Sequence, residues 1–250
     1  MLRLQTSIIF YPMKKIFFLL LAFSFALFSC KKDESGGGNG GTTQRFPLDA
    51  AADYVGYAFS KATGGIDWHL ERMAYMASQQ EFEQKDSSFV MKNPASDTVV
   101  KFEYNAQYSY LLLNPDEYYL DFYCQGGFSS PVLNSLDQPT GTWYMTGIST
   151  SSNYYKVNGN GTDGGSQYNK AFNINQSSII SYTFHDVLID KNSLLAAGGT
   201  ATVNISGSGV GYSSFAYTGT LTFMGNRMAK LILNDTSYTV NLAKAKVTQP

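Results

Sequence analysis

The feature that most constrains the fold of this chain is an alternation of apolar and polar residues that begins near residue 88. In an extended chain, Val100, Phe102 and Tyr104 lie on one face, and Lys101 and Glu103 lie on the other. This period of two is typical of a strand that buries one face. The pattern returns along the rest of the chain, and no helical repeat separates the segments.

Short strands are therefore predicted over most of the chain, with Gly, Asn, Asp and Pro turn signals between them. They cover 100–106, 118–124, 141–150, 154–157, 168–174, 179–189, 200–206, 215–224, 228–233 and 237–247. The turn signals are Asn114-Pro115-Asp116, Gly126-Gly127, Asn158-Gly159, Gly198-Gly199, Gly225-Asn226 and Asn234-Asp235. The segments 218–224, 228–233 and 238–242, with the last two turns between them, are predicted to form an antiparallel meander. About ten short strands of this kind favour a mainly β fold, an antiparallel β-sandwich or barrel.

Two helices are predicted before the strands. Leu48, Val55 and Phe59 recur at the spacing of one helix face, and Pro47 suits a first helical turn. A second helix is predicted from Asp67, a favourable N-cap residue. Its apolar face consists of Ile66, Leu70, Met73, Ala74 and Ala77, with Trp68, His69 and Tyr75 at the border or on the surface.

The composition excludes several classes of protein. The chain has 18 basic and 19 acidic residues, which is not the basic excess of a nucleic-acid binder. Its 44% hydrophobic residues are too many for a disordered chain. Two Cys cannot build a disulfide scaffold, and two His leave little scope for zinc chemistry.

The N-terminus has the pattern of a signal peptide. Met13-Lys14-Lys15 forms a positive segment, and residues 16–29 are a run of 14 apolar or small residues. That length suits a signal peptide better than a transmembrane anchor, which is the alternative reading. Met13 is also a better start than Met1, so residues 1–12 are interpreted as an over-extended start.

Cys30 follows this run directly. The segment Leu27-Phe28-Ser29-Cys30 resembles the lipobox of bacterial lipoproteins, although Phe28 stands where that family has a small residue. The resemblance implies that Cys30 becomes the first mature residue and carries acyl chains that hold the protein on a lipid bilayer.

The next residues, Lys31-Lys32-Asp33-Glu34-Ser35, resemble the export tag of Bacteroidota-type surface lipoproteins. A solvated charge cluster in a tether is the alternative. The resemblance implies a location in the cell envelope, anchored to the outer membrane, and leaves open whether the domain faces the periplasm or the cell surface.

Four segments follow from these patterns. Residues 1–29 are a signal peptide, and 30–45 are the lipidated Cys and a Gly-rich tether. Residues 46–85 are a helical hairpin, and 86–250 are the antiparallel β domain. Removal of the signal peptide takes away three basic residues and no acid, so the mature chain has a net charge of about −4.

Few residues suggest catalysis. Cys124 lies on the same strand face as Leu120 and Phe122, which predicts a buried thiol. His69 lies on a predicted helix without a metal-binding motif, and His185 lies in a strand with Asp186 on the opposite face.

A glycosidase would need two facing carboxylates. Asp116-Glu117, with Asp121 nearby, is the densest pair of acids beside a strand, and a solvated turn explains Asp116-Glu117 equally well.

One loop has the composition of a calcium site. Asn158, Asn160 and Asp163 place oxygen atoms between glycines over residues 158–165, and alternating oxygen ligands can surround Ca²⁺. The stretch partly resembles one Gly-Asp calcium-binding repeat. A hairpin loop that needs positive φ angles explains the same residues.

Tyrosine is abundant in the middle of the chain. Adjacent pairs such as Tyr118-Tyr119 put one ring on each face of a strand, so one ring of each pair leaves the core. Exposed aromatic rings on a rigid sheet can bind sugars or protein partners, although tyrosine is also an ordinary half-buried strand residue. The predicted ligand-binding residues are Tyr118, Tyr123, Trp143 and Tyr154.

Three functional hypotheses remain. The first is a non-catalytic binding module for a glycan or protein ligand, anchored through acylated Cys30. The second is a structural or assembly lipoprotein of the envelope without a small ligand. The third is a hydrolase of extracellular polymers, although the sequence favours a protein that is not an enzyme. No cofactor and no nucleic-acid partner are predicted.

Overall fold

A computed structural model describes residues 44–79, 85–93 and 99–249 of the chain. All of them belong to one compact unit. The predicted signal peptide, Cys30 and nearly all of the tether lie outside these residues.

Two helices open this unit, as predicted. Helix α1 (Leu48–Phe59) follows Pro47, a 3₁₀ turn η1 (Lys61–Thr63) comes next, and helix α2 (Ile66–Ser78) begins after Gly65. Asp67 therefore lies in the first turn of α2, and its prediction as the N-cap is wrong. Among the described residues no helix is long and apolar enough to cross a membrane.

Twelve strands follow the helices. They are β1 (Lys85–Lys92), β2 (Lys101–Asn114), β3 (Glu117–Ser129), β4 (Leu133–Asp137), β5 (Thr140–Thr146), β6 (Tyr154–Asn169), β7 (Ile174–Asp190), β8 (Ala196–Gly209), β9 (Phe215–Phe223), β10 (Met228–Leu233), β11 (Thr236–Asn241) and β12 (Lys246–Thr248).

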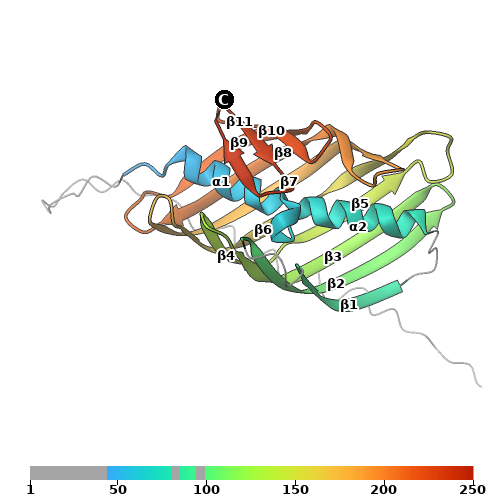
Figure 1. The fold of residues 1–250 in the computed structure, drawn as a ribbon, viewed down its shortest axis with the longest axis horizontal. Coiled ribbons are helices and arrows are strands. Elements are labelled where there is room, and N and C mark those ends of the chain that lie inside the picture. Colours follow the sequence, from blue (N-terminus) through green and yellow to red (C-terminus); the bar gives the residue numbers. More distant parts are fainter. Residues whose placement is uncertain (1–43, 80–84, 94–98, 250) are drawn as a thin grey trace, which may run out of the picture. The chain divides into compact units, whose positions relative to one another are not determined.

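All twelve strands belong to one antiparallel sheet, which confirms a mainly β fold that follows two helices (Figure 1). The strand order is β1-β2-β3-β4-β6-β7-β8-β9-β10-β11-β12, and β5 pairs with β3 and β6 beside β4. The meander of β9, β10 and β11 that the sequence predicts is confirmed. Its turns at Gly225-Asn226 and Asn234-Asp235 contain residues with positive φ angles.

Three predicted turns are wrong, because they lie inside strands: Gly126-Gly127 in β3, Asn158-Gly159 in β6 and Gly198-Gly199 in β8. A Cβ atom on Gly126 would lie 2.1 Å from the carbonyl oxygen of Glu103 on the neighbouring strand. Glycine is required there by the close approach of two strands and not by a turn. The strands predicted over 168–174 and 237–247 are also wrong, because the turn between β6 and β7 lies within the first and the turn between β11 and β12 lies within the second.

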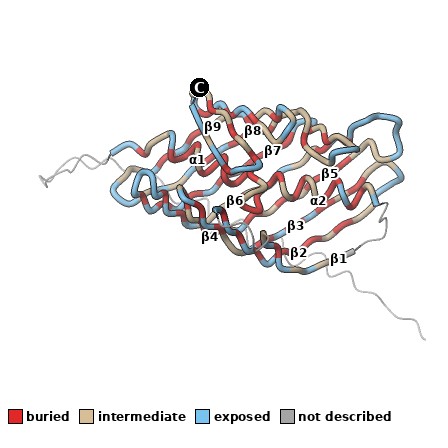
Figure 2. Tube along the Cα trace, viewed as in Figure 1, coloured by how far each residue is buried: buried red, intermediate tan, exposed pale blue. Residues whose placement is uncertain are grey.

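Both helices lie across one face of the sheet, here called the inner face (Figure 1). Their side chains share one core with that face: the rings of Phe59 and Tyr182 are 5.5 Å apart, and those of Tyr57 and Phe128 are 5.7 Å apart. Buried and exposed residues alternate along most strands (Figure 2). The outer face, opposite the helices, carries the exposed set.

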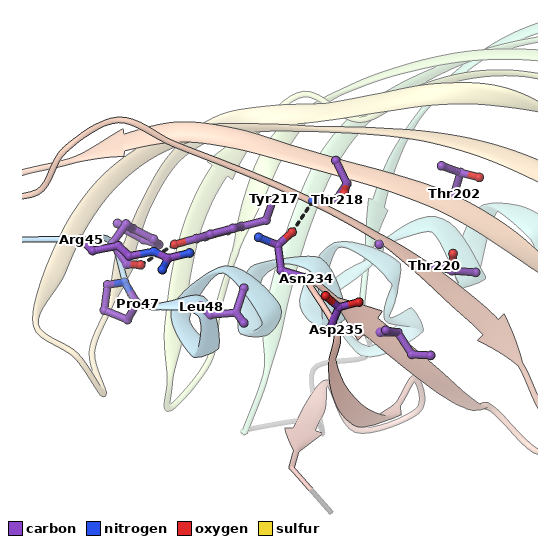
Figure 3. Close-up of a pocket in the computed structure, with 12 residues that line it drawn as sticks. Arg45, Pro47, Leu48, Thr202, Tyr217, Thr218, Thr220, Asn234 and Asp235 are labelled. Carbon is purple, nitrogen blue, oxygen red and sulfur yellow. Dashed lines mark hydrogen bonds between the residues drawn. The ribbon is translucent and has the colours of Figure 1, made fainter.

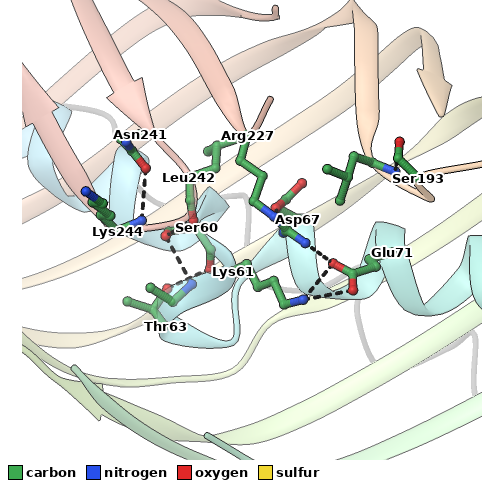
Figure 4. Close-up of polar contacts among 12 residues, drawn as sticks. Ser60, Lys61, Thr63, Asp67, Glu71, Ser193, Arg227, Asn241, Leu242 and Lys244 are labelled. Carbon is green, nitrogen blue, oxygen red and sulfur yellow. Dashed lines mark hydrogen bonds and ion pairs between the residues drawn. The ribbon is translucent and has the colours of Figure 1, made fainter. Parts of the chain in front are cut away.

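A charged cluster joins the helices to the far end of the sheet (Figure 4). Arg227, in the turn between β9 and β10, places one guanidinium nitrogen 2.8 Å from the carboxylate of Asp67 and another beside Glu71. Lys61 also lies 2.8 Å from Glu71. The Asp67 side chain is only 3% exposed, so Arg227 supplies the counter-charge of a nearly buried carboxylate.

Arg227→Met is expected to lower the free energy of unfolding by about 3 kcal/mol, because it leaves the buried Asp67 without its partner. Urea unfolding of the variant and the wild type measures this difference. Lys156→Met is the matched control, because it breaks an exposed ion pair of 3.5 Å with Asp186 and should leave stability nearly unchanged. An Arg227→Met protein as stable as the wild type would show that this contact does not hold the helices.

Candidate functional site

The four predicted ligand-binding residues do not share one surface. Tyr118 and Trp143 are fully buried on the inner face, where the Trp143 ring packs 4.8 Å from that of Phe122. Tyr123 and Tyr154 are 39% and 41% exposed on the outer face. The structure therefore keeps Tyr123 and Tyr154 at the surface and places the other two in the core.

The neighbours of the two buried residues are the ones that reach the outer face. Tyr119 pairs with Tyr144 across β3 and β5, and their ring centroids are 5.3 Å apart at an angle of 60°. Tyr144 is 40% exposed. The sequence contained the signal for this assignment, because Leu120 and Cys124 of β3 are apolar and fix which face is buried. Tyr119, Tyr123 and Tyr144 are called the tyrosine surface below.

A row of polar side chains crosses the sheet beside these rings. Each member pairs directly with the next across neighbouring strands from β3 to β9, and all lie on the outer face. The spacing between paired strands makes the row about 24 Å long. This hydroxyl row consists of Asp121, Thr142, Asn160, Thr183, Thr202 and Thr220. It presents hydroxyl and amide groups with a single carboxylate, which accepts a hydrogen bond of 2.8 Å from Thr142.

The row has a hollow near each end. A hollow of about 250 Å³ beside Asp121 is lined by Tyr123, Gln107 and Ser109, among others. At the other end, Thr202 and Thr220 help to line a hollow of about 960 Å³ that reaches the start of α1 (Figure 3). The row and its hollows thus form one extended surface that could receive a chain-like ligand.

A bulge in β7 places His185 and Asp186 next to this row. The sequence predicts them on opposite faces, which is wrong because the bulge exposes both. Asn158 donates to the Asp186 carboxylate at 3.0 Å and accepts from the Asp186 backbone N–H. This hydrogen bond, with the charge of Lys156, holds the pKa of Asp186 below its ordinary value. His185 lies 2.9 Å from the Thr202 hydroxyl.

The predicted calcium loop is part of a strand. Residues 158–165 lie within β6, where Asn158 and Asn160 face outward and Asp163 is buried on the inner face. Side chains on opposite faces of one strand cannot surround the same ion. In the described part of the chain, no three His, Cys, Asp or Glu side chains group as metal ligands.

The acids considered for hydrolysis are not brought together. Asp116 accepts hydrogen bonds from the backbone and the hydroxyl of Ser149, which lowers the pKa of Asp116 and fixes that loop. Glu117 accepts from Asn114 at the turn between β2 and β3. Asp121 lies further along β3, in the hydroxyl row.

The other two reactive side chains lie in the core. His69 is fully buried, stacks on Phe122 at 4.3 Å and contacts the Tyr108 hydroxyl through Nδ1. Burial lowers the pKa of His69 to about 3, so the ring is neutral. The predicted border or surface position of His69 is wrong. Cys124 is a free, buried thiol as predicted, and burial raises its pKa to about 12.

Comparisons with known proteins identify no relative of this chain: no family model, curated protein or solved structure matches it.

The assignment of faces can be tested by stability. Trp143→Ala is expected to lower the free energy of unfolding by about 3–5 kcal/mol, because it empties a fully buried site. Tyr144→Ala should have a much smaller effect, because that ring is 40% exposed. Thermal and urea unfolding of the two variants measure the contrast, and equal losses would contradict the assignment.

Proposed function

We propose that this protein is a lipid-anchored protein of the cell envelope whose β domain binds a neutral glycan on its outer face. The proposal rests mainly on the pair of half-buried Tyr119 and exposed Tyr144 on the outer face, beside the hydroxyl row. The rings offer apolar faces for stacking on sugar rings, and the row offers hydrogen-bond partners for sugar hydroxyls.

The charge of the row favours a neutral ligand over an anionic or cationic one. Five of its six side chains are Thr or Asn, and the sixth, Asp121, already accepts a hydrogen bond from Thr142. A strongly basic ligand would find one carboxylate in this row, and a strongly acidic one would find no cation in it. The row's length suits several consecutive sugar units.

A protein ligand is the second candidate, and an exposed apolar pair favours it. Leu136 and Val210 are 72% and 77% exposed, and both line a hollow of about 760 Å³ without a charged side chain. Exposed apolar side chains that gather in one hollow with a polar rim are typical of protein contact sites. A structural or assembly role would use this part of the outer face, away from the tyrosine surface.

Glycan binding is tested by screening the purified protein on a glycan array and by affinity electrophoresis in gels that contain neutral soluble glucans. Tyr119→Ala/Tyr144→Ala is expected to weaken binding at least about tenfold, which corresponds to 1.4 kcal/mol. Tyr75→Ala is the matched control, because Tyr75 is 45% exposed on α2. Absence of glycan binding, or unchanged binding by the double variant, would contradict the proposal.

The anchor is tested separately. Cells that express the wild-type chain should incorporate labelled palmitate into it, and Cys30→Ala should abolish that label because the acylated thiol is lost. Cys124→Ala is the control and should retain the label, because that thiol is buried. Protease treatment of whole cells then reports whether the domain faces outward. Label retained in Cys30→Ala would contradict the lipoprotein assignment.

A further inference from the structure

The inner face contains a pair of carboxylates that the outer surface does not use. Asp137 of β4 and Asp163 of β6 are 3% and 2% exposed and point toward the helices. Asp137 is paired across the sheet with Gly126 of β3 and with Gly165 of β6. Both of these residues lack a side chain, so neither directly paired position covers the Asp137 carboxylate. Asp163 lies two residues from Gly165 on the same face, which makes it a diagonal neighbour of Asp137.

These carboxylates lack the partners that buried charges need. Among the described residues, neither oxygen of Asp137 has a hydrogen-bond partner, nor does Oδ1 of Asp163. Neither carboxylate takes part in the ion pairs of the described residues. Burial raises the pKa of Asp137 to about 6, and burial with the Asp137 charge raises that of Asp163 well above its usual range. Two adjacent buried acids of this kind require either protons or a cation.

Hydroxyl groups lie beside the pair, and two of them are also unpartnered. The hydroxyls of Tyr54 and Ser135 are buried without a hydrogen-bond partner in the described part of the chain. Tyr54 comes from α1, and its hydroxyl lies near enough to Asp163 to lower the pKa of that carboxyl, although it does not meet hydrogen-bond geometry with Asp163 or with the nearby Ser135. Ser135 and Tyr104 lie close to Asp137 in the same way. Hydroxyl oxygens from α1, β2 and β4 therefore lie beside the two acids, and the protonated Cys124 thiol of β3 lies near both.

We propose that Asp137 and Asp163 bind one Ca²⁺ ion between α1 and the sheet, with Tyr54 and Ser135 as neutral oxygen ligands. Two carboxylates balance the charge of a divalent cation. Hydroxyl oxygens beside carboxylates suit Ca²⁺, which accepts six to eight oxygen ligands in flexible geometry, better than Mg²⁺, which demands a near-ideal octahedron. The set differs from the loop site predicted from sequence, because only Asp163 is common to both. The site does not depend on the proposed glycan binding.

The first test uses the purified wild-type protein. Ca²⁺ added after EGTA treatment should raise the melting temperature at constant ionic strength, and Mg²⁺ should raise it less. Tb³⁺ should luminesce when the tyrosines are excited, and Ca²⁺ should displace it. No change in melting temperature with Ca²⁺, or no displaceable Tb³⁺ signal, would overturn the proposal.

The second test assigns the site to these residues. Asp137→Asn and Asp163→Asn preserve side-chain size and should each reduce Ca²⁺ affinity at least tenfold and lose most of the thermal shift. Asp121→Asn is the matched control, because it removes an exposed carboxylate of β3 and should keep the full response. A response retained in both inner variants would overturn the proposal. A second result would also overturn it: the melting temperature of the wild type does not change with Ca²⁺, and the Asp137→Asn and Asp163→Asn variants melt at a higher temperature than the wild type in EGTA. The two carboxyl groups would then share a proton instead of a cation. If the variants do not fold, the wild-type titration decides alone.

Discussion

The rest of the structure depends on how the inner face of the sheet is covered. An antiparallel sheet of twelve strands, each with alternating side chains, presents one apolar face that must be removed from water. Helices α1 and α2 provide that cover, and α1 is so fully enclosed that nine of its twelve residues are buried. Gly56 of α1 allows β12 to pack against it, because a Cβ there would lie 2.2 Å from a methyl carbon of Val247.

Covering the sheet in this way also brings polar groups inside. Asp67 meets Arg227 in a contact that links α2 to a turn 160 residues later in the chain. Asp137 and Asp163 have no such basic partner among the described residues, although they are buried to a similar degree. The core thus contains one carboxylate of α2 that is paired with an arginine, and two carboxylates of the sheet that need a proton or a cation from outside.

The outer face has a different character because nothing in the described residues covers the tyrosine surface. Its long strands carry Thr, Asn and Tyr in register, so side chains far apart in sequence, such as Asp121 and Thr220, belong to one row. The bulge at His185 and Asp186 adds charged and titratable groups beside that row. Function is proposed on this face because it combines exposed rings with repeated hydrogen-bonding groups.

The sequence alone determined the mainly β class, both helices, the C-terminal meander and the buried Cys124, because each depends on local periodicity or on turn residues. It also determined that one ring of each adjacent aromatic pair leaves the core. The apolar residues Leu120 and Cys124 lie on the same strand face as Tyr118, so the sequence could also have shown that Tyr118 is the buried ring. Only the tertiary structure decided that Gly126 and Gly159 lie inside strands, because their role depends on how closely neighbouring strands approach. It likewise decided that Asp163 turns inward to meet Asp137, since strand pairing between distant segments brings these two carboxylates together.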